Sequence, residues 1–180
     1  MRVIGGKYKG KRFVPPKNFP SRPTTDFAKE ALFNILENRY DFDDLEVLDL
    51  FSGTGSIGLE FLSRGVKNVI SIDNHSISCK FLKTSQESLN EKNWQIRKQD
   101  AAQFLKQTIL KFDIIFADPP YEMKGAEELA KIVFERNLLN QNGILILEHG
   151  KQSNFEKINQ FKELRNYGGV HFSFFESTNL

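Results

Sequence analysis

The residues Asp118-Pro119-Pro120-Tyr121 combine one carboxylate, two consecutive prolines and one aromatic ring. The prolines fix the backbone and remove two N–H donors, so the turn presents carbonyl oxygens. The Asp118 carboxylate and the Pro119 carbonyl could then accept both hydrogens of an exocyclic amino group and leave its nitrogen lone pair facing a reacting carbon. Tyr121 could stack on an extruded base. We predict that these four residues are catalytic; the alternative is a proline-rich turn in which Tyr121 only packs.

A second informative stretch runs from Val47 to Gly58 and reads VLDLFSGTGSIG. An apolar strand passes through a glycine-rich turn into a helix, which places the turn at the sheet edge where open α/β folds bind ligands. Glycines there let a ligand approach the backbone. The spacing Gly53-x-Gly55-x-x-Gly58, with Asp73 at a typical distance beyond it, also fits a dinucleotide site. The motif alone leaves both NAD and S-adenosylmethionine open as cofactors.

The position of Asp49 favours S-adenosylmethionine. Its carboxylate precedes the glycine turn, where it would repel a pyrophosphate but complement the positively charged amino and sulfonium groups of the methyl donor. We therefore predict a cofactor site built from the turn and from the ends of the next two strands. Its residues are Asp49, Phe51, Ser52, Gly53, Thr54, Gly55, Asp73, Asn74, Asp100 and Ala101.

Two of these carboxylates have a structural alternative. Asp73 could accept hydrogen bonds from both ribose hydroxyls, or it could cap the helix that opens after it. Asp100 could bind the adenine amine or cap the next helix, and the backbone N–H of Ala101 could reach an adenine nitrogen. Ligand binding and capping both stay open at these positions.

Histidine and cysteine give no sign of metal chemistry. His75, His149 and His171 lie far apart without ligand spacing, although His149 could border the pocket, and Cys79 is the single cysteine. One cysteine makes no internal disulfide, and no apolar run approaches the roughly 20 residues that span a bilayer. We predict no metal, no membrane association and a cytoplasmic location.

Basic residues are concentrated at the N-terminus. The chain has 25 Lys and Arg against 23 Asp and Glu, a formal net charge of +2, yet seven basic residues precede the first acid, Asp26. Tyr8, Phe13 and Phe19 are interleaved with these charges, as in segments that bind a phosphate backbone. We predict a nucleic-acid partner, with a solvated surface hairpin as the alternative. The predicted phosphate contacts are Arg2, Lys7, Lys9, Lys11, Arg12 and Arg22.

The elements that must position these residues follow an α/β order. Apolar runs alternate with helical patterns from Glu46 onward, which indicates a largely parallel sheet covered on both faces. Two further runs, 163–167 and 170–175, flank Gly168-Gly169 and predict a closing antiparallel hairpin. The other predicted strands are 47–51, 68–73, 94–97, 112–117 and 143–148, and the predicted helices are 57–63, 76–92, 101–110, 126–137 and 153–159.

Before this core we expect a small β-hairpin and a helix. Runs at Arg2–Ile4 and Arg12–Val14 predict two short strands with a turn at Gly5-Gly6. Thr25 or Asp26 would cap a helix over 26–39. We interpret the chain as one domain with a basic arm at 1–22, this helix, and a core at 46–176.

Taken together, these features resemble the RsmD family of bacterial 16S ribosomal RNA (guanine-N2)-methyltransferases. The resemblance runs nearly end to end: RVIGG at 2–6, KGKR at 9–12, RPTTD at 22–26, EALFNIL at 30–36, DLFSGTG at 49–55, DPPY at 118–121 and RNYG at 165–168. The opening Ile-Gly-Gly and Arg-Pro-Thr elements separate this family from other enzymes that carry Asp-Pro-Pro-Tyr.

The resemblance implies a Rossmann-like class I methyltransferase fold and S-adenosylmethionine-dependent methylation of a guanine N2. The target would lie in the 16S rRNA of the small ribosomal subunit or of an assembly intermediate. Arg22, Thr24 and Thr25 would close over the cofactor or target, so Thr25 joins the cofactor-binding set. The family often carries Arg-x-Arg where this chain has Phe27-Ala28-Lys29, so an RNA contact there is weakened or relocated. We expect a monomer.

Three other functions stay open at this point. The two acceptors of Asp118-Pro119-Pro120, the proline corner, would equally hold the N6 amino group of an adenine in DNA or RNA. A chain of this fold could also be a non-catalytic RNA-binding assembly factor. The glycine spacing, with Asp73, keeps an NAD-dependent oxidoreductase as a further alternative.

Overall fold

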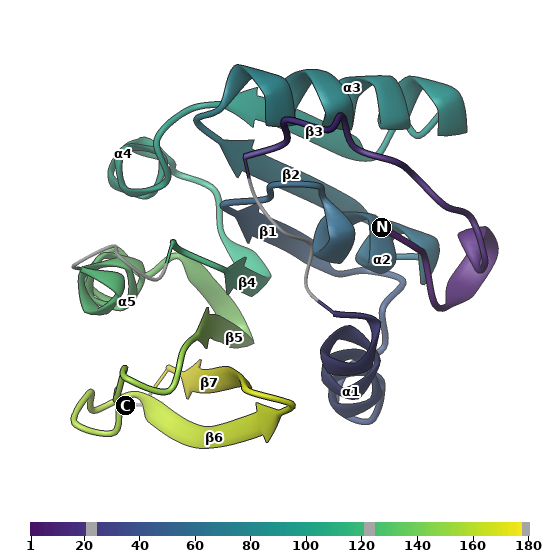
Figure 1. Ribbon diagram of the computed structural model, residues 1–180. Coiled ribbons are helices and arrows are strands. Elements are labelled where there is room, and N and C mark those ends of the chain that lie inside the picture. Colours follow the sequence, from purple (N-terminus) through teal and green to yellow (C-terminus); the bar gives the residue numbers. More distant parts are fainter. Residues whose placement is uncertain (21–24, 121–124, 178–180) are drawn as a thin grey trace.

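The computed structural model describes residues 1–20, 25–120 and 125–177. Within these ranges, seven strands form one sheet in the order β3-β2-β1-β4-β5-β7-β6 (Figure 1). Strands β1 to β5 are parallel, and β7 runs antiparallel to both β5 and β6, which confirms the predicted fold class. The strands are β1 (Glu46–Leu50), β2 (Asn68–Asp73), β3 (Trp94–Lys98), β4 (Phe112–Ala117), β5 (Leu139–His149), β6 (Phe161–Tyr167) and β7 (Val170–Glu176).

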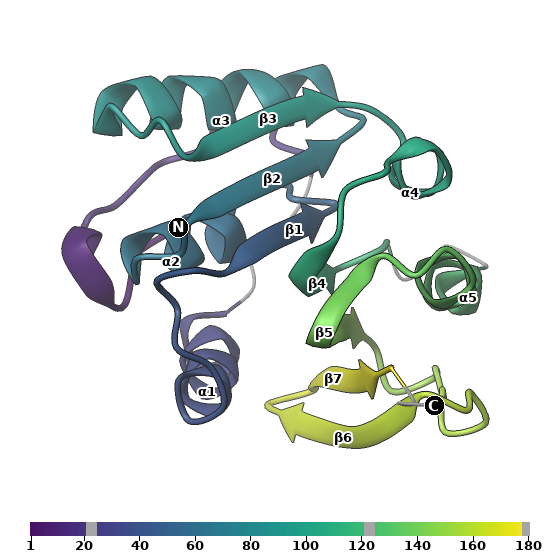
Figure 2. The same cartoon turned by 180° about the vertical axis from the view of Figure 1, so that it is seen from behind.

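Helices cover both faces of the sheet (Figures 1 and 2). Successive side chains of a strand point to opposite faces. Val47 and Ile114 therefore pack in the core under three helices, and their neighbours Leu48 and Ile115 pack under two others. The first group is α1 (Asp26–Glu37), α2 (Ser56–Ser63) and α3 (Ser76–Leu89), and the second is α4 (Ala101–Gln107) and α5 (Ala126–Glu135). No helix in the described ranges is long and apolar enough to cross a membrane.

The prediction of a helix at 153–159 was wrong, because this segment forms separate turns. The Asn154 side chain accepts a hydrogen bond from the Glu156 backbone N at 2.9 Å, and Ile158 N donates to Phe155 O at 3.0 Å. Such local bonds offer the backbone an alternative to a helix, and a segment this short gains little from propagation once nucleated.

Several other helices end earlier than their apolar patterns predicted. α1, α3, α4 and α5 each stop two or three residues before the expected position. Asn90, after α3, adopts a left-handed conformation with φ 51°, and Asn137, beyond α5, does the same with φ 54°. Asparagine tolerates this conformation better than most residues, so it ends a helix that periodicity alone would extend.

The N-terminal arm doubles back as predicted, but with one bridge in place of two strands. Arg2 and Arg12 form a single antiparallel bridge, and a short 3₁₀ helix, η1 (Gly6–Tyr8), follows the expected turn. A side chain at Gly6 would come within 1.8 Å of the Ser63 carbonyl oxygen on α2. The arm is therefore docked tightly against α2.

Glu60, on α2, fastens the arm to the body. Its fully buried carboxylate accepts hydrogen bonds from Ile4 N at 2.9 Å and Gly5 N at 2.7 Å. The buried Lys29 Nζ lies 3.7 Å from the same carboxylate and donates to Arg2 O at 2.6 Å. Burial lowers the pKa of Lys29, and the Glu60 charge opposes that shift. The arm is thus held by a buried ion pair that also satisfies backbone groups.

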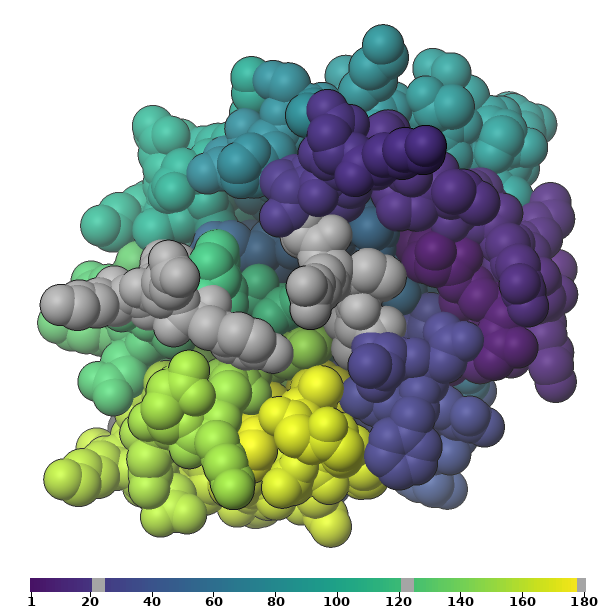
Figure 3. Space-filling model, viewed as in Figure 1, coloured from purple at the N-terminus to yellow at the C-terminus, as the bar shows by residue number. Residues whose placement is uncertain are grey.

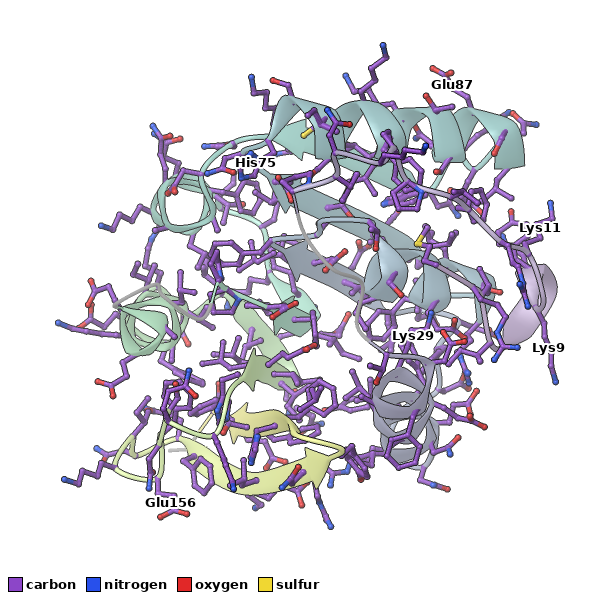
Figure 4. All side chains as sticks on the ribbon, viewed as in Figure 1. Lys9, Lys11, Lys29, His75, Glu87 and Glu156 are labelled. Carbon is purple, nitrogen blue, oxygen red and sulfur yellow. The ribbon has the colours of Figure 1, made fainter. Side chains whose placement is uncertain are left out.

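Replacing Glu60 with alanine should destabilise the protein by about 3–5 kcal/mol, because it leaves the Lys29 cation buried without its partner. Urea unfolding measures this loss, and hydrogen exchange should show faster exchange at the Ile4 and Gly5 amides. Glu87→Ala is the control, since Glu87 projects into solvent from α3 (Figure 4) and should change stability by less than about 0.5 kcal/mol. Equal stabilities for the two variants would contradict the role of Glu60 in holding the arm.

Candidate active site

A cavity of about 720 Å³ opens at the carboxyl ends of β1, β2 and β4. This volume is within the usual range for small-molecule and cofactor sites. The described lining contains no lysine or arginine but includes the carboxylates of Asp49, Asp73, Asp100, Asp118 and Glu148. The cavity is therefore acidic and suits a positively charged ligand better than an anionic one.

Most of the predicted site residues line this cavity. Gly55 and Ala101 do not belong to the described lining, and Tyr121, Arg22 and Thr24 lie outside the described residues. The predicted residues that do line it are Thr25, Asp49, Phe51, Ser52, Gly53, Thr54, Asp73, Asn74, Asp100, Asp118, Pro119 and Pro120.

The glycine turn after β1 is sharply bent and locked to β2. Phe51 and Gly53 both have positive φ, 58° and 51°. A left-handed phenylalanine is strained, so the surrounding bonds must hold it. Ser52 N donates to Ile72 O at 3.0 Å, and Gly53 N donates to the Asp73 carboxylate at 2.8 Å. The turn is thus preorganised by the end of the neighbouring strand.

Asp73 serves both as a structural bridge and as part of the lining. Its second carboxylate oxygen accepts a hydrogen bond from His75 N at 2.8 Å, at the start of α3. A carboxylate oxygen can accept more than one hydrogen bond, so both oxygens keep capacity for ligand hydroxyls. The alternative that Asp73 caps α3 is wrong, because His75 is the N-cap residue and no described side chain caps this helix. Ligand binding by Asp73 stays a prediction.

Asp49 is buried beneath the turn. It is held by a chain of two hydrogen bonds, the Ser71 relay, which the sequence did not predict. Ser71 Oγ donates to Asp49 Oδ2 at 3.2 Å, and Trp94 Nε1 donates to Ser71 Oγ at 3.0 Å. Burial raises the pKa of Asp49 to about 7, although hydrogen bonds from Ser52 and Ser71 lower it. Ser71 is directly paired with Asp49 in the β1–β2 register, which is the signal that could have identified it.

The glycines that follow the turn serve close packing. A side chain at Gly58 would meet Asp49 Oδ2 at 2.8 Å and Ser71 Oγ at 2.9 Å, so only glycine lets α2 lie this close to β1 and β2. A side chain at Gly55 would meet Leu82 Cδ2 at 2.3 Å. Gly55 therefore lies close against α3, and its predicted role in binding the cofactor stays a prediction.

The proline corner lies on the strand next to Asp49. Ala117, the last residue of β4, pairs with Leu50 in β1, and Asp118 N lies 3.4 Å from Leu50 O. Burial raises the pKa of Asp118 to about 7. Asp118 and Pro119 thus reach the same cavity as Asp49 from an adjacent strand, which is the arrangement that the two motifs predicted.

The remaining candidates separate into lining and supporting residues. Asp100 caps α4 by accepting from Gln103 N at 2.8 Å and also lines the cavity. His149 bonds Ser173 Oγ at 2.8 Å and stays outside the lining, whereas its neighbour Glu148, which sequence reasoning did not assign, lines it. An acid at the end of a buried parallel strand was the available signal. The described residues contain no cluster that could hold a metal ion.

Comparisons with known proteins identify the family of the chain. The chain matches the family described as Conserved hypothetical protein 95 over residues 1–176. It is 32% identical to Ribosomal RNA small subunit methyltransferase D of Haemophilus influenzae over 155 residues, which are 84% of this chain and 79% of the relative. The Escherichia coli K12 protein of the same name is 31% identical over 149 residues, 82% of this chain and 74% of the relative.

A solved structure shares this fold over nearly its whole length. The structure of a hypothetical protein from Thermus thermophilus superposes with a TM-score of 0.85 at 26% identity, covering 98% of this chain and 99% of that one. The family match spans the arm, the glycine turn and the proline corner together. The chain therefore belongs to the Conserved hypothetical protein 95 family, and the resemblance to RsmD proteins drawn from its motifs is confirmed.

Proposed function

We propose that this protein is an S-adenosylmethionine-dependent methyltransferase that modifies the N2 amino group of a guanine in 16S rRNA of the small ribosomal subunit. The observation that carries the proposal is the meeting, at one sheet edge, of an acidic cavity and the Asp118-Pro119-Pro120 corner. Relatives named for small-subunit rRNA methylation support the substrate class.

The cavity fits the proposed cofactor better than a dinucleotide. Bound S-adenosylmethionine would supply a methyl group already activated by its positive sulfur. Asp49 would complement the cationic amino acid end, directly or through water, and Asp73 would accept from the ribose hydroxyls. Asp100 would lie toward the adenine. A pyrophosphate in the same cavity would face carboxylates with no described lysine or arginine to neutralise it.

The proline corner would position the amino group that is methylated. The Asp118 carboxylate and the Pro119 carbonyl would each accept one N–H, so the nitrogen lone pair faces the methyl carbon and the reaction becomes an in-line displacement. The nitrogen gains a methyl group and must lose one proton. With its pKa raised to about 7, the Asp118 carboxylate is suited to receive that proton near neutral pH.

The choice of guanine N2 rests on the RsmD resemblance, because the same two acceptors would also hold adenine N6. RNA binding is supported by the arm, where Lys9 and Lys11 project from the surface (Figure 4). Arg2 and Lys7 are instead paired with Asp26 and Glu91 at 2.9 and 2.8 Å. We assign the phosphate contacts chiefly to Lys9, Lys11 and Arg12, and propose that the protein works as a monomer in the cytoplasm, where ribosomes assemble.

Incubation with labelled S-adenosylmethionine and small-subunit particles that lack the modification should transfer label to N2 of one guanine in 16S rRNA. Asp118→Asn should reduce transfer by at least about 100-fold, because an amide accepts the amino group less well and cannot take its proton. Filter binding should show unchanged RNA affinity. Label on another base would refute the guanine assignment, and full activity of Asp118→Asn would remove Asp118 from the reaction.

Neutralising Lys9, Lys11 and Arg12 to glutamine should weaken RNA binding and flatten its dependence on salt. Each lost phosphate contact lowers the slope of log affinity against log salt by about 0.7 to 0.9. Titrations at several salt concentrations measure this slope. Replacing Lys106 and Lys111, which are exposed and far from the arm in sequence, should leave the slope unchanged. Equal slopes for both sets of variants would show that the arm does not contact phosphates.

The affinity for S-adenosylhomocysteine should rise with pH through about 7, because ionised Asp49 attracts the ligand's ammonium group. Ser71→Ala removes a hydrogen bond that lowers the pKa of Asp49, so the midpoint of this rise should move to higher pH. Calorimetric titrations across the neutral range measure the midpoint. Ser85→Ala, a buried serine on α3 outside the cavity lining, should keep the wild-type value. An unmoved midpoint in Ser71→Ala would contradict the relay.

A further inference from the structure

Phe27 is an aromatic side chain left open to solvent beside the cavity. It is 64% exposed and is the one aromatic residue among the large exposed hydrophobic side chains of the described chain. It is the second residue of α1, and Thr25, two residues before it, lines the cavity. Single exposed apolar residues are common and need no explanation by themselves. A functional role for Phe27 therefore has to be argued from the residues around it.

The ring is braced by the C-terminal hairpin. Its centroid lies 6.2 Å from that of Tyr167 in an edge-to-face arrangement, and a side chain at Gly168 would lie 3.8 Å from Phe27 Cδ1. Val170, which opens β7, lines the cavity. Figure 3 shows the start of α1 between the purple arm and the yellow hairpin on one face of the molecule. Phe27 thus stands at the rim, supported on one side and open on the other.

The arm brings an exposed cation close to this rim. Arg2 is neutralised by Asp26, the residue before Phe27, at 2.9 Å, and this ion pair joins the arm to the start of α1. Arg12, which is exposed, lies opposite Arg2 in the arm bridge. Burial and the Lys29 charge lower the pKa of the Met1 ammonium group, the Asp26 charge raises it, and the Arg12 charge lowers it further, so these charged groups lie close together. A polyanion that follows the arm would therefore pass beside the ring. Aromatic rings next to cationic grooves are the usual stacking sites for unpaired bases.

We propose that Phe27, held edge-on by Tyr167, is a stacking platform for an unpaired RNA base next to the base whose amino group enters the cavity. The proposal rests on RNA being the substrate, as proposed above. The phosphates would follow the exposed cations of the arm while one base lies flat on the open face of Phe27. Phe27 would therefore act in substrate binding and take no part in the transfer step.

Steady-state methylation of unmodified small-subunit particles tests the platform. Phe27→Ala should raise KM for the particles about tenfold, since one stacked base is lost, while kcat and the affinity for S-adenosylhomocysteine stay unchanged. Phe27→Trp should stay within about twofold of wild type because it keeps a π face. Phe27→Leu should be as weak as Phe27→Ala, which separates stacking from simple apolar contact. Ile109→Ala, at a position 91% exposed and far from the rim in sequence, is the matched control and should change none of these values.

Three results would overturn the platform. They are an unchanged KM in Phe27→Ala, full retention of affinity in Phe27→Leu, or a loss of S-adenosylhomocysteine binding in Phe27→Ala, which would assign the ring a structural role. Each of these three results is compared with the activity of the wild-type enzyme under the same conditions. A wild-type protein that binds S-adenosylhomocysteine but methylates no rRNA would instead refute the proposed function.

Discussion

Carboxylates buried beneath the glycine turn impose the constraint on which the site depends. A carboxylate removed from water is tolerated only where hydrogen bonds or a positive charge compensate it. Asp73 obtains two backbone donors from Gly53 and His75. Asp49 obtains Ser71 but retains a pKa raised to about 7, so its ionised form is incompletely compensated. A positively charged ligand would therefore stabilise ionised Asp49, and the proposed methyl donor would carry such a charge at this place.

Helix α2 contacts both the cavity and the N-terminal arm. Its first residue, Ser56, lines the cavity, and Ser56 Oγ accepts a hydrogen bond from Lys29 Nζ at 3.0 Å. Lys29 also bonds the arm at Arg2 O, and Glu60 of the same helix holds the arm through two backbone amides. The basic arm and the glycine turn are therefore both joined to α2, which would hold a bound substrate and cofactor in a fixed relative geometry.

The sequence predicted those features that arise from local patterns. Strands β2 and β4 have the predicted bounds, because buried parallel strands are apolar runs between breaking residues. The helix at 153–159 failed because the side chain of Asn154 favours a turn, which periodicity does not register. Ser71 became visible only through the register of two strands, and Glu60 only through the docked arm. Contacts between distant segments of chain are what single-sequence patterns omit.

The acidic lining of this cavity should favour a cationic methyl donor over an anionic dinucleotide. Thermal unfolding of the wild-type protein with increasing S-adenosylhomocysteine or NAD tests it most directly, because a ligand that binds only the folded state raises the melting temperature with its concentration. We expect the melting temperature to rise progressively with S-adenosylhomocysteine and to stay unchanged with NAD. Stabilisation by NAD, with no effect of S-adenosylhomocysteine, would contradict it.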